Sequence, residues 1–245
     1  MIYERNEHSV MIQEAKALEI RENVSRIREN MKDYPNVSIM AVIKTRTPEE
    51  INFAICECGV TLLGENRVQE LLAHYDDLDH SAALHFIGSL QKNKVKYIID
   101  KVDMIESLDS ISLAAEIDKQ AKKIGIRMPV LIEINIGREA SKGGIFPEAL
   151  PVFCDEIRQY ESILPTGLMT IAPICENKED YNGYFSEMRR LLETVFSEKF
   201  PNTEKPILSM GMSGSFHEAL QNGTDIIRIG EGIFGKRGEP YKKAE

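Results

Sequence analysis

Short apolar runs alternate with amphipathic runs from residue 37 onward, and eight of the apolar runs are typical of buried strands. They cover residues 37–44, 61–66, 83–89, 104–109, 128–136, 164–173, 206–212 and 225–232. Near-continuous apolar strands separated by helices predict a parallel sheet that is covered on both faces. Eight such units in 245 residues favour an α/β fold of the (β/α)8 TIM-barrel type. An open doubly wound sheet is the alternative, since strand order is not written in a sequence.

The helix boundaries support this division. Thr47 and Pro48 are a cap and a first helical residue, and Gly59 is a stop signal. A second amphipathic run ends at Gly125, and the longest covers residues 177–200, whereas the third and fourth units are short. We expect a single domain over residues 1–245, with an extra N-terminal helix at about 6–31 and the barrel at about 37–237.

Lys44 is the first candidate for chemistry, because it follows four apolar residues at the end of the first predicted strand. Functional residues of such barrels lie where strands end and loops begin. A lysine at this place can simply extend into solvent. Alternatively, apolar surroundings favour its neutral amine, which can attack a carbonyl group and form a Schiff base.

Glycine and serine follow the seventh and eighth strands, where such barrels usually bind phosphate. Ser213, Gly214 and Ser215 precede a short predicted helix over 216–221, whose free N–H groups favour an anion. Plain capping by a serine is the alternative. Gly230 allows close backbone approach after the eighth strand, and Arg228 within that strand requires a buried partner. Together with Lys44, these residues describe a pocket for pyridoxal 5'-phosphate (PLP).

The composition limits the classes of partner that the protein can be expected to bind. A net charge of −9 argues against nucleic acid and anionic membranes. The chain has no apolar run of about 20 residues and a polar N-terminus, so we expect a cytoplasmic protein without membrane spans. We also expect no metal site and reduced thiols, because the spacing of the cysteines does not fit a zinc site: Cys56, Cys58, Cys154 and Cys175.

Seven motifs in the same order resemble the PLP homeostasis protein family (YggS/PROSC type), which is similar to the barrel domain of alanine racemase. They are AVIKTRT, GENRVQE, LHFIGSLQKNKVK, INIGREASKGGI, GLMTIAP, LSMGMS and IRIGEGIFGKR, from about Val37 to Arg237. The resemblance implies that Lys44 holds PLP as an internal aldimine. It further implies phosphate contacts at Ser213 and the adjacent Gly214, and backbone contacts at Gly230 and Glu231.

The same resemblance implies that Arg228 faces the pyridine nitrogen, and that Asn66 and Met210 are neighbours of the ring. The chain also departs from the family pattern. The usual serine before the lysine is Ile43, a usual lysine is Arg46, and the usual threonine or serine after Gly230 is Glu231. Loss of that hydroxyl and a carboxylate beside a phosphate predict weaker PLP binding than is usual.

The resemblance implies intracellular PLP homeostasis with little or no catalysis. Racemisation needs an acid or base on each face of the substrate, and the racemases take the second from an additional β-domain of a partner subunit. A weakly active PLP-dependent racemase or related PLP enzyme is the first alternative, and a barrel that has lost PLP binding is the second. We expect PLP as ligand, PLP-dependent apoenzymes as candidate recipients, and a monomer.

Overall fold

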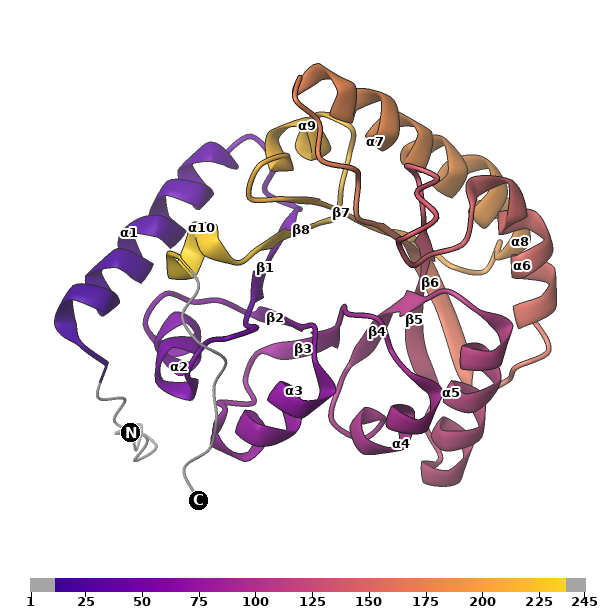
Figure 1. Ribbon diagram of the computed structural model, residues 1–245, viewed down its shortest axis with the longest axis horizontal. Helices are drawn as coiled ribbons and strands as arrows, with labels where there is room; N and C mark the ends of the chain where they lie inside the picture. Colours follow the sequence, from indigo (N-terminus) through magenta and orange to yellow (C-terminus); the bar gives the residue numbers. More distant parts are fainter. Residues whose placement is uncertain (1–11, 237–245) are drawn as a thin grey trace.

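The computed structural model describes residues 12–236 and contains a closed eight-stranded parallel barrel (Figure 1). The strands pair in chain order and are β1 (Ser38–Val42), β2 (Leu62–Glu65), β3 (Ala83–Phe86), β4 (Met104–Leu108), β5 (Met128–Ile134), β6 (Ile163–Thr170), β7 (Ile207–Met212) and β8 (Ile226–Ile229). Closure is made by the pairing of β1 with β8, in which Ser38 to Ala41 lie opposite Ile226 to Ile229. The predicted TIM barrel is confirmed, and the open sheet is wrong.

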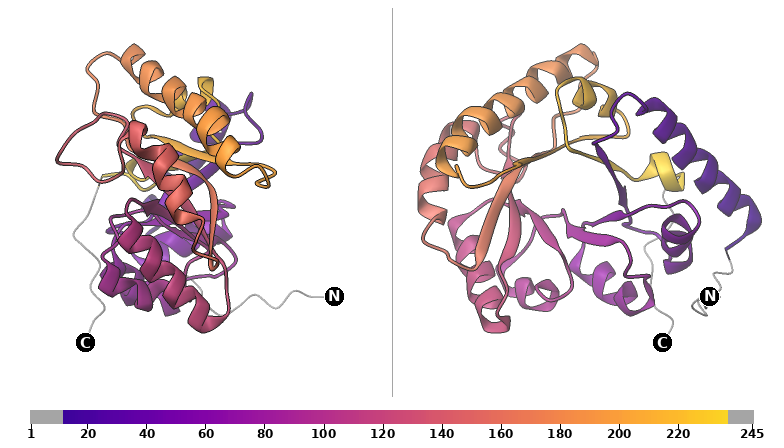
Figure 2. Two further views of the ribbon diagram at one scale, coloured as in Figure 1. Left: turned by 90° about the vertical axis from the view of Figure 1, so that its right-hand side faces the viewer. Right: turned by 180° about the vertical axis from the view of Figure 1, so that it is seen from behind.

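Helices surround the strands, as the side and rear views show (Figure 2). The α-helices are α1 (Glu14–Asn30), α2 (Pro48–Cys56), α3 (Val68–His74), α4 (Val95–Ile98), α5 (Ile111–Ile124), α6 (Leu150–Ile157), α7 (Glu179–Leu191), α8 (Ser197–Lys199), α9 (Phe216–Gln221) and α10 (Glu231–Phe234). A π-helical turn, Leu192–Phe196, joins α7 to α8, and the single turn of α4 explains the weak helical pattern of its unit.

Local sequence sets the predicted helix ends. Thr47 and Glu50 form a capping box at the start of α2, which satisfies two N–H groups that the helix leaves free. Ser110 accepts a hydrogen bond from Leu113 at the start of α5, and Gly125 ends that helix in the left-handed conformation. The cap predicted at Thr47 and the stop predicted at Gly125 are therefore confirmed, whereas α2 ends at Cys56, three residues before the predicted stop at Gly59.

Side chains of each strand alternate between two apolar regions. The larger region lies between the strands and the helices, and it includes Ala41, Ile43 and Phe86. The smaller clusters contain the alternate strand residues and fill the barrel interior: Met40, Val42, Leu62, Ile87, Ile226, and separately Met104, Leu131 and Met169. A polar residue that shares the strand face of Met40 or Met104 therefore lies inside the barrel.

Helix α1 packs beside α10 on the outside of the barrel (Figure 1). Asn23 donates from Nδ2 to the carbonyl oxygen of Ile233 at 2.9 Å, and Lys16 donates to that of Phe234. Arg46 donates to the carbonyl oxygens of Phe234 and Gly235 at 3.1 and 2.7 Å. The predicted N-terminal helix begins at Glu14, and residues 6–11 of the prediction lie outside the described range. Over residues 12–236, no helix is both long enough and apolar enough to cross a membrane.

Candidate functional site

Lys44 lies in a tight turn directly after β1. The amide of Arg46 donates to the carbonyl oxygen of Ile43 at 3.0 Å, which makes Lys44 and Thr45 the two central residues. Thr45 has φ of 63°, a left-handed conformation that a β-branched residue rarely adopts. Lys44 is half-buried, while Ile43 is fully buried among the apolar side chains outside the strands. The chain therefore leaves the direction of the strand in a turn whose first central residue is Lys44.

The loops after β7 and β8 meet beside this turn. A Cβ atom on Gly230 would lie 3.5 Å from both Cβ and the carbonyl oxygen of Val42, two residues before Lys44. A Cβ atom on Gly232 would lie 3.4 Å from Ser213 Oγ. Ser213 and Gly214 are exposed, and no described heavy atom lies within 4 Å of the position of a Cβ on Gly214. The structure thus brings Lys44, Ser213, Gly214 and Gly230 to one end of the barrel.

Asn66 follows β2 at the same end. Its Oδ1 atom is buried and has no hydrogen-bond partner among the described residues, which is costly for an amide oxygen. The backbone of Asn66 is held close to Gly88, where a Cβ would lie 2.0 Å from the Asn66 carbonyl oxygen. A ligand that donates a hydrogen bond could therefore use Asn66 Oδ1.

Arg228 lies inside the barrel in a chain of hydrogen bonds. Its Nη1 donates to Ser209 Oγ at 2.7 Å, and its Nη2 donates to the carbonyl oxygen of Thr170 at 2.6 Å. Ser209 Oγ donates in turn to Glu106 Oε2 at 2.6 Å, and His85 Nδ1 lies 2.7 Å from Glu106 Oε1. Burial lowers the pKa of Arg228, and the charge of Glu106 opposes this shift. The predicted need of Arg228 for a buried partner is confirmed.

Two further carboxyl groups lie near the same mouth. Burial, together with the charge of Asp109, raises the pKa of Glu133 to about 7, and the nearby Arg228 opposes the shift. A Cβ on Gly143 would lie 3.6 Å from Glu133 Oε1 and 3.7 Å from Asp109 Oδ2, so both carboxyl groups face the loop that follows β5. Burial also raises the pKa of Asp109.

Sequence reasoning did not select His85, Glu106 or Glu133. The signal that could have found them is an ionisable residue in the middle of an apolar strand, as in MIESL and LIEIN.

Met210 stands apart from the other candidates. Its side chain is fully buried in the apolar region between strands and helices, whereas its neighbour Ser209 lies inside the barrel. The expectation that Met210 lies beside the site is therefore not supported for its side chain. Glu231 is the exposed first residue of α10, and Gly230 is the N-cap of that helix.

A buried carboxyl–imidazole pair supports the loop after β2. Glu65 Oε1 accepts hydrogen bonds from the amides of Asn66 and Arg67 at 2.6 and 2.8 Å, and Glu65 Oε2 lies 3.5 Å from His74 Nε2. Burial raises the pKa of Glu65 to about 8 and lowers the pKa of His74 to about 4. Both shifts therefore favour the neutral form of the group in the folded protein.

Between pH 7 and pH 8, we expect the free energy of unfolding to decrease less in the Glu65→Gln variant than in wild type. Folded Glu65 keeps a proton up to its raised pKa, while the unfolded chain has already lost it above its ordinary range, so stability falls as pH rises through about 8. His74 has its pKa lowered, so its contribution is lost only as pH falls toward 4.

The free energy of unfolding, from urea titrations at pH 7 and pH 8, should fall by about 1 kcal/mol less in the variant. The same substitution at exposed Glu57 is the control and should keep the wild-type slope. An unchanged slope in Glu65→Gln would contradict the assignment.

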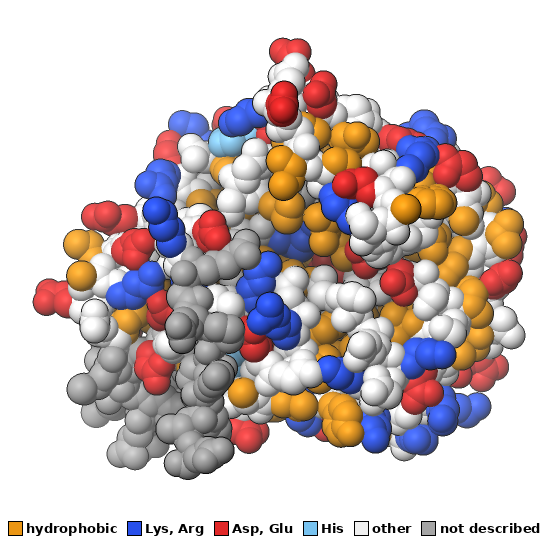
Figure 3. Space-filling view, in the orientation of Figure 1, with side chains coloured by type: hydrophobic (Ala, Val, Ile, Leu, Met, Phe, Trp, Pro, Cys, Tyr) orange, Lys and Arg blue, Asp and Glu red, His pale blue; other side chains and the backbone are white. Residues whose placement is uncertain are grey.

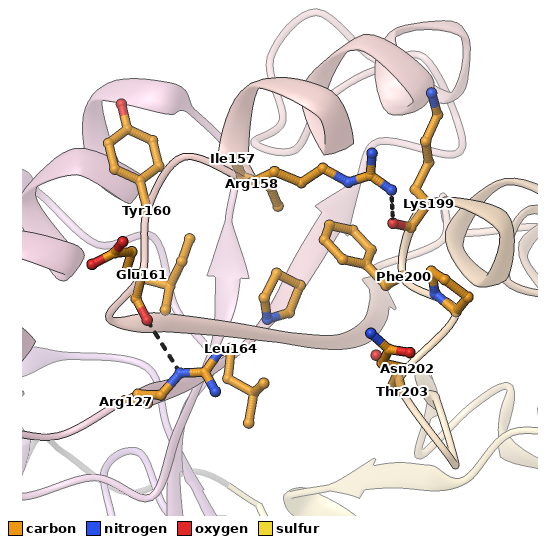
Figure 4. Close-up of a pocket in the computed structure, with 13 residues that line it drawn as sticks. Arg127, Ile157, Arg158, Tyr160, Glu161, Leu164, Lys199, Phe200, Asn202 and Thr203 are labelled. Carbon is orange, nitrogen blue, oxygen red and sulfur yellow. Dashed lines mark hydrogen bonds between the residues drawn. The ribbon is translucent and has the colours of Figure 1, made fainter.

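Figure 3 shows the carboxyl-terminal end of the barrel, where hydrophobic side chains border a central hollow in which Lys or Arg atoms are visible. A separate pocket of about 770 Å³ lies at the opposite end, and its lining residues come from the segments that precede β5, β6 and β7 and from the start of β6 (Figure 4). There Arg127 Nε donates to the carbonyl oxygen of Glu161 at 3.1 Å, and Arg158 donates to that of Lys199. The residues assembled around Lys44 do not line this pocket.

Comparison with known proteins identifies the family. The family model of the alanine racemase N-terminal domain matches residues 17–238. A pyridoxal phosphate homeostasis protein of Aquifex aeolicus is 44% identical over 200 residues, which are 81% of this chain and 86% of that protein. The chain belongs to the pyridoxal phosphate homeostasis protein family. The family predicted from the seven motifs is thereby confirmed.

Other members and more distant structures agree with this assignment. The pyridoxal phosphate homeostasis protein of Haemophilus influenzae is 32% identical, over 86% of this chain and 89% of that protein. The structure of PipY from Synechococcus elongatus with PLP bound is 29% identical, covers 88% of this chain and all of that one, and has a TM-score of 0.78. An alanine racemase of Clostridium difficile has a TM-score of 0.71 at 18% identity, over 91% of this chain and 59% of that one, and shares the fold.

Proposed function

We propose that this protein binds PLP in intracellular PLP homeostasis and holds the cofactor on Lys44 with little or no catalysis. The observation that carries the proposal is the meeting of a strand-end lysine with the open loops after β7 and β8 at one end of the barrel. The names of the relatives and the PLP bound to PipY support the same function. Bound PLP would supply an aldehyde for the amine and an anionic phosphate.

The residues at this end fit PLP. Lys44 provides the nucleophile: its amine forms a C=N bond to the aldehyde carbon, and the aldehyde oxygen leaves as water. Ser213, Gly214 and Gly230 provide a hydroxyl and exposed backbone for the phosphate, and the short α10 begins at Glu231 beside them. Asn66 Oδ1 provides a buried acceptor that no described group uses. In this assignment Met210 contributes through its backbone rather than its side chain.

Arg228 argues for weak catalysis. It offers N–H donors to the barrel interior and is anchored by Ser209 and Thr170. A ring nitrogen that faces a guanidinium group stays unprotonated, and such a ring withdraws electrons poorly. A PLP-dependent racemase with weak activity remains the second candidate, because Glu133 lies near the same mouth with its pKa raised to about 7, where a general base is effective.

The proposal also covers the binding partners, the cellular location and the oligomeric state of the protein. We propose PLP-dependent apoenzymes as recipients of the cofactor, a cytoplasmic location and a monomeric state. The net charge of −9 disfavours binding to an anionic membrane surface, which supports the proposed location.

The function is tested by adding PLP to the purified protein, reducing with borohydride and mapping the modified peptide by mass spectrometry. We expect one modified lysine, Lys44. Modification spread over several surface lysines, or no modification at all, would favour a barrel that has lost PLP binding.

We expect Glu231→Thr to bind PLP about tenfold more tightly than wild type. The variant adds a hydroxyl that can donate to the phosphate and removes a carboxylate that repels it, and one charged hydrogen bond accounts for about that factor. Dissociation constants from titration of the PLP absorbance measure the effect. Glu231→Gln separates the two causes, because it removes the charge without adding the hydroxyl. Equal affinities of wild type and Glu231→Thr would contradict the prediction.

A further inference from the structure

The turn that carries Lys44 is held from outside β1. The amide of Thr45 donates to Glu70 Oε2 at 2.6 Å, across 25 positions of sequence. Glu70 lies on α3, and its side chain is only 7% exposed, so solvent competes little for this hydrogen bond. A hydrogen bond from an amide to a charged carboxylate is roughly twice as strong as a neutral one.

The hydrogen bond acts at a strained residue. Thr45 has φ of 63° in the third position of the turn, a place that normally needs glycine or asparagine. Such conformations persist only where surrounding contacts hold them, and they cluster at functional sites. The Thr45 amide joins this strained turn to α3 through its hydrogen bond to Glu70.

Glu70 makes a second contact through its other oxygen. Its other oxygen, Oε1, accepts a hydrogen bond from Arg67 Nη1 at 2.8 Å, and that arginine side chain is 57% exposed. The first amides of the loop and helix are fixed in turn by Glu65. The carboxylate of Glu70 is therefore placed by α3 and transmits that position to the turn after β1.

We propose that Glu70 is a positioning residue for Lys44: by holding the Thr45 amide, it stabilises the left-handed turn that directs the lysine amine into the site. The inference rests on the proposed function, in which Lys44 forms a Schiff base with PLP. Without the carboxylate of Glu70, the backbone of Thr45 relaxes toward negative φ. The amine of Lys44 then no longer points toward the aldehyde of PLP. Glycine at position 45 adopts the left-handed conformation without strain, so it removes the need for Glu70.

The test compares the rate of Schiff-base formation, followed by absorbance after mixing protein with PLP, in Glu70→Ala, Thr45→Gly and the double variant. We expect Glu70→Ala to be slower by about tenfold, the effect of one charge-assisted hydrogen bond. In the double variant, the rate of Schiff-base formation should recover to within about threefold of the wild-type rate. Arg67→Ala is the matched control, because it removes the ion pair of Glu70 and leaves the contact with Thr45. The rate of Schiff-base formation in Arg67→Ala should stay within about twofold of the wild-type rate.

A second measurement needs no cofactor. Hydrogen exchange of the Thr45 amide, measured by NMR in the PLP-free protein, should be faster in Glu70→Ala and unchanged in Arg67→Ala. Glu70→Gln, which keeps the shape of the side chain and weakens the acceptor, should fall between wild type and Glu70→Ala in both measurements and serves if the alanine variant does not fold.

The results of these measurements distinguish a failure of the role proposed for Glu70 from a failure of the proposed function. Wild-type rates in folded Glu70→Ala or Glu70→Gln, or failure of Thr45→Gly to restore the rate, would overturn the role of Glu70. If wild type itself forms no Schiff base at Lys44, the proposed function fails. Amide exchange then still decides whether Glu70 holds the turn, and unchanged exchange overturns that role too.

Discussion

Lys44→Ala is expected to abolish the borohydride-fixed product and to raise the dissociation constant for PLP by about a hundredfold. The substitution removes the proposed covalent bond between protein and cofactor and leaves the proposed phosphate contacts of Ser213 and Gly230 in place. A hundredfold change corresponds to about 2.7 kcal/mol of binding free energy. Equilibrium dialysis gives the dissociation constant, and the absorbance of the Schiff base gives the loss of the bond.

Lys142→Ala is the control for this variant. Lys142 lies in the loop after β5 and forms an ion pair with Glu139, so its removal takes away another lysine of the same face without touching the turn after β1. Its affinity should stay close to that of wild type. If Lys142→Ala lost as much affinity as Lys44→Ala, the assignment of Lys44 as the single attachment point would be wrong.

Arg228→Met is expected to lower the free energy of unfolding by about 3–5 kcal/mol, the cost of breaking a buried charge network from one side. The variant leaves Glu106 in the barrel interior without the cation that Ser209 connects to it. It also removes the hydrogen bond that Arg228 Nη2 donates to the Thr170 carbonyl oxygen. Urea denaturation at pH 7 measures the difference.

A double-mutant cycle with Glu106→Gln separates charge from packing. In the Glu106→Gln background, the cost of Arg228→Met should fall by about 1 kcal/mol or more, because no buried carboxylate is left behind. An equal cost in both backgrounds would mean that Arg228 and Glu106 do not stabilise each other, and the network assignment would be wrong.

The sequence predicts the barrel and the end at which the site lies, because both follow from local patterns. Apolar runs locate each strand, and parallel strands in a closed barrel bring their carboxyl ends to one face. Lys44 and Gly230 therefore come together although 186 residues separate them. Their proximity depends on pairing of β1 with β8, which the eight-unit pattern implies.

The direction of individual side chains was harder to predict. Met210 was assigned to the site, yet its side chain packs outside the strands. Alternation along β7 does give this direction, because Leu208 and Met210 face outward and Ser209 faces inward, but the expectation for Met210 rests on the family resemblance alone. The interior network is not predicted for another reason: its members come from five different strands, and only the pairing of these strands in three dimensions connects them.

The contacts of α1 with α10 join the first described helix to the last one. Lys16, Asn23 and Arg46 all donate to carbonyl oxygens between Ile233 and Gly235, immediately after the glycine loop assigned to the phosphate. Local openings of a protein spread through shared contacts of this kind. Fraying of the first helix would therefore loosen the last loop, and the time that a cofactor stays bound would depend on a helix that never touches it.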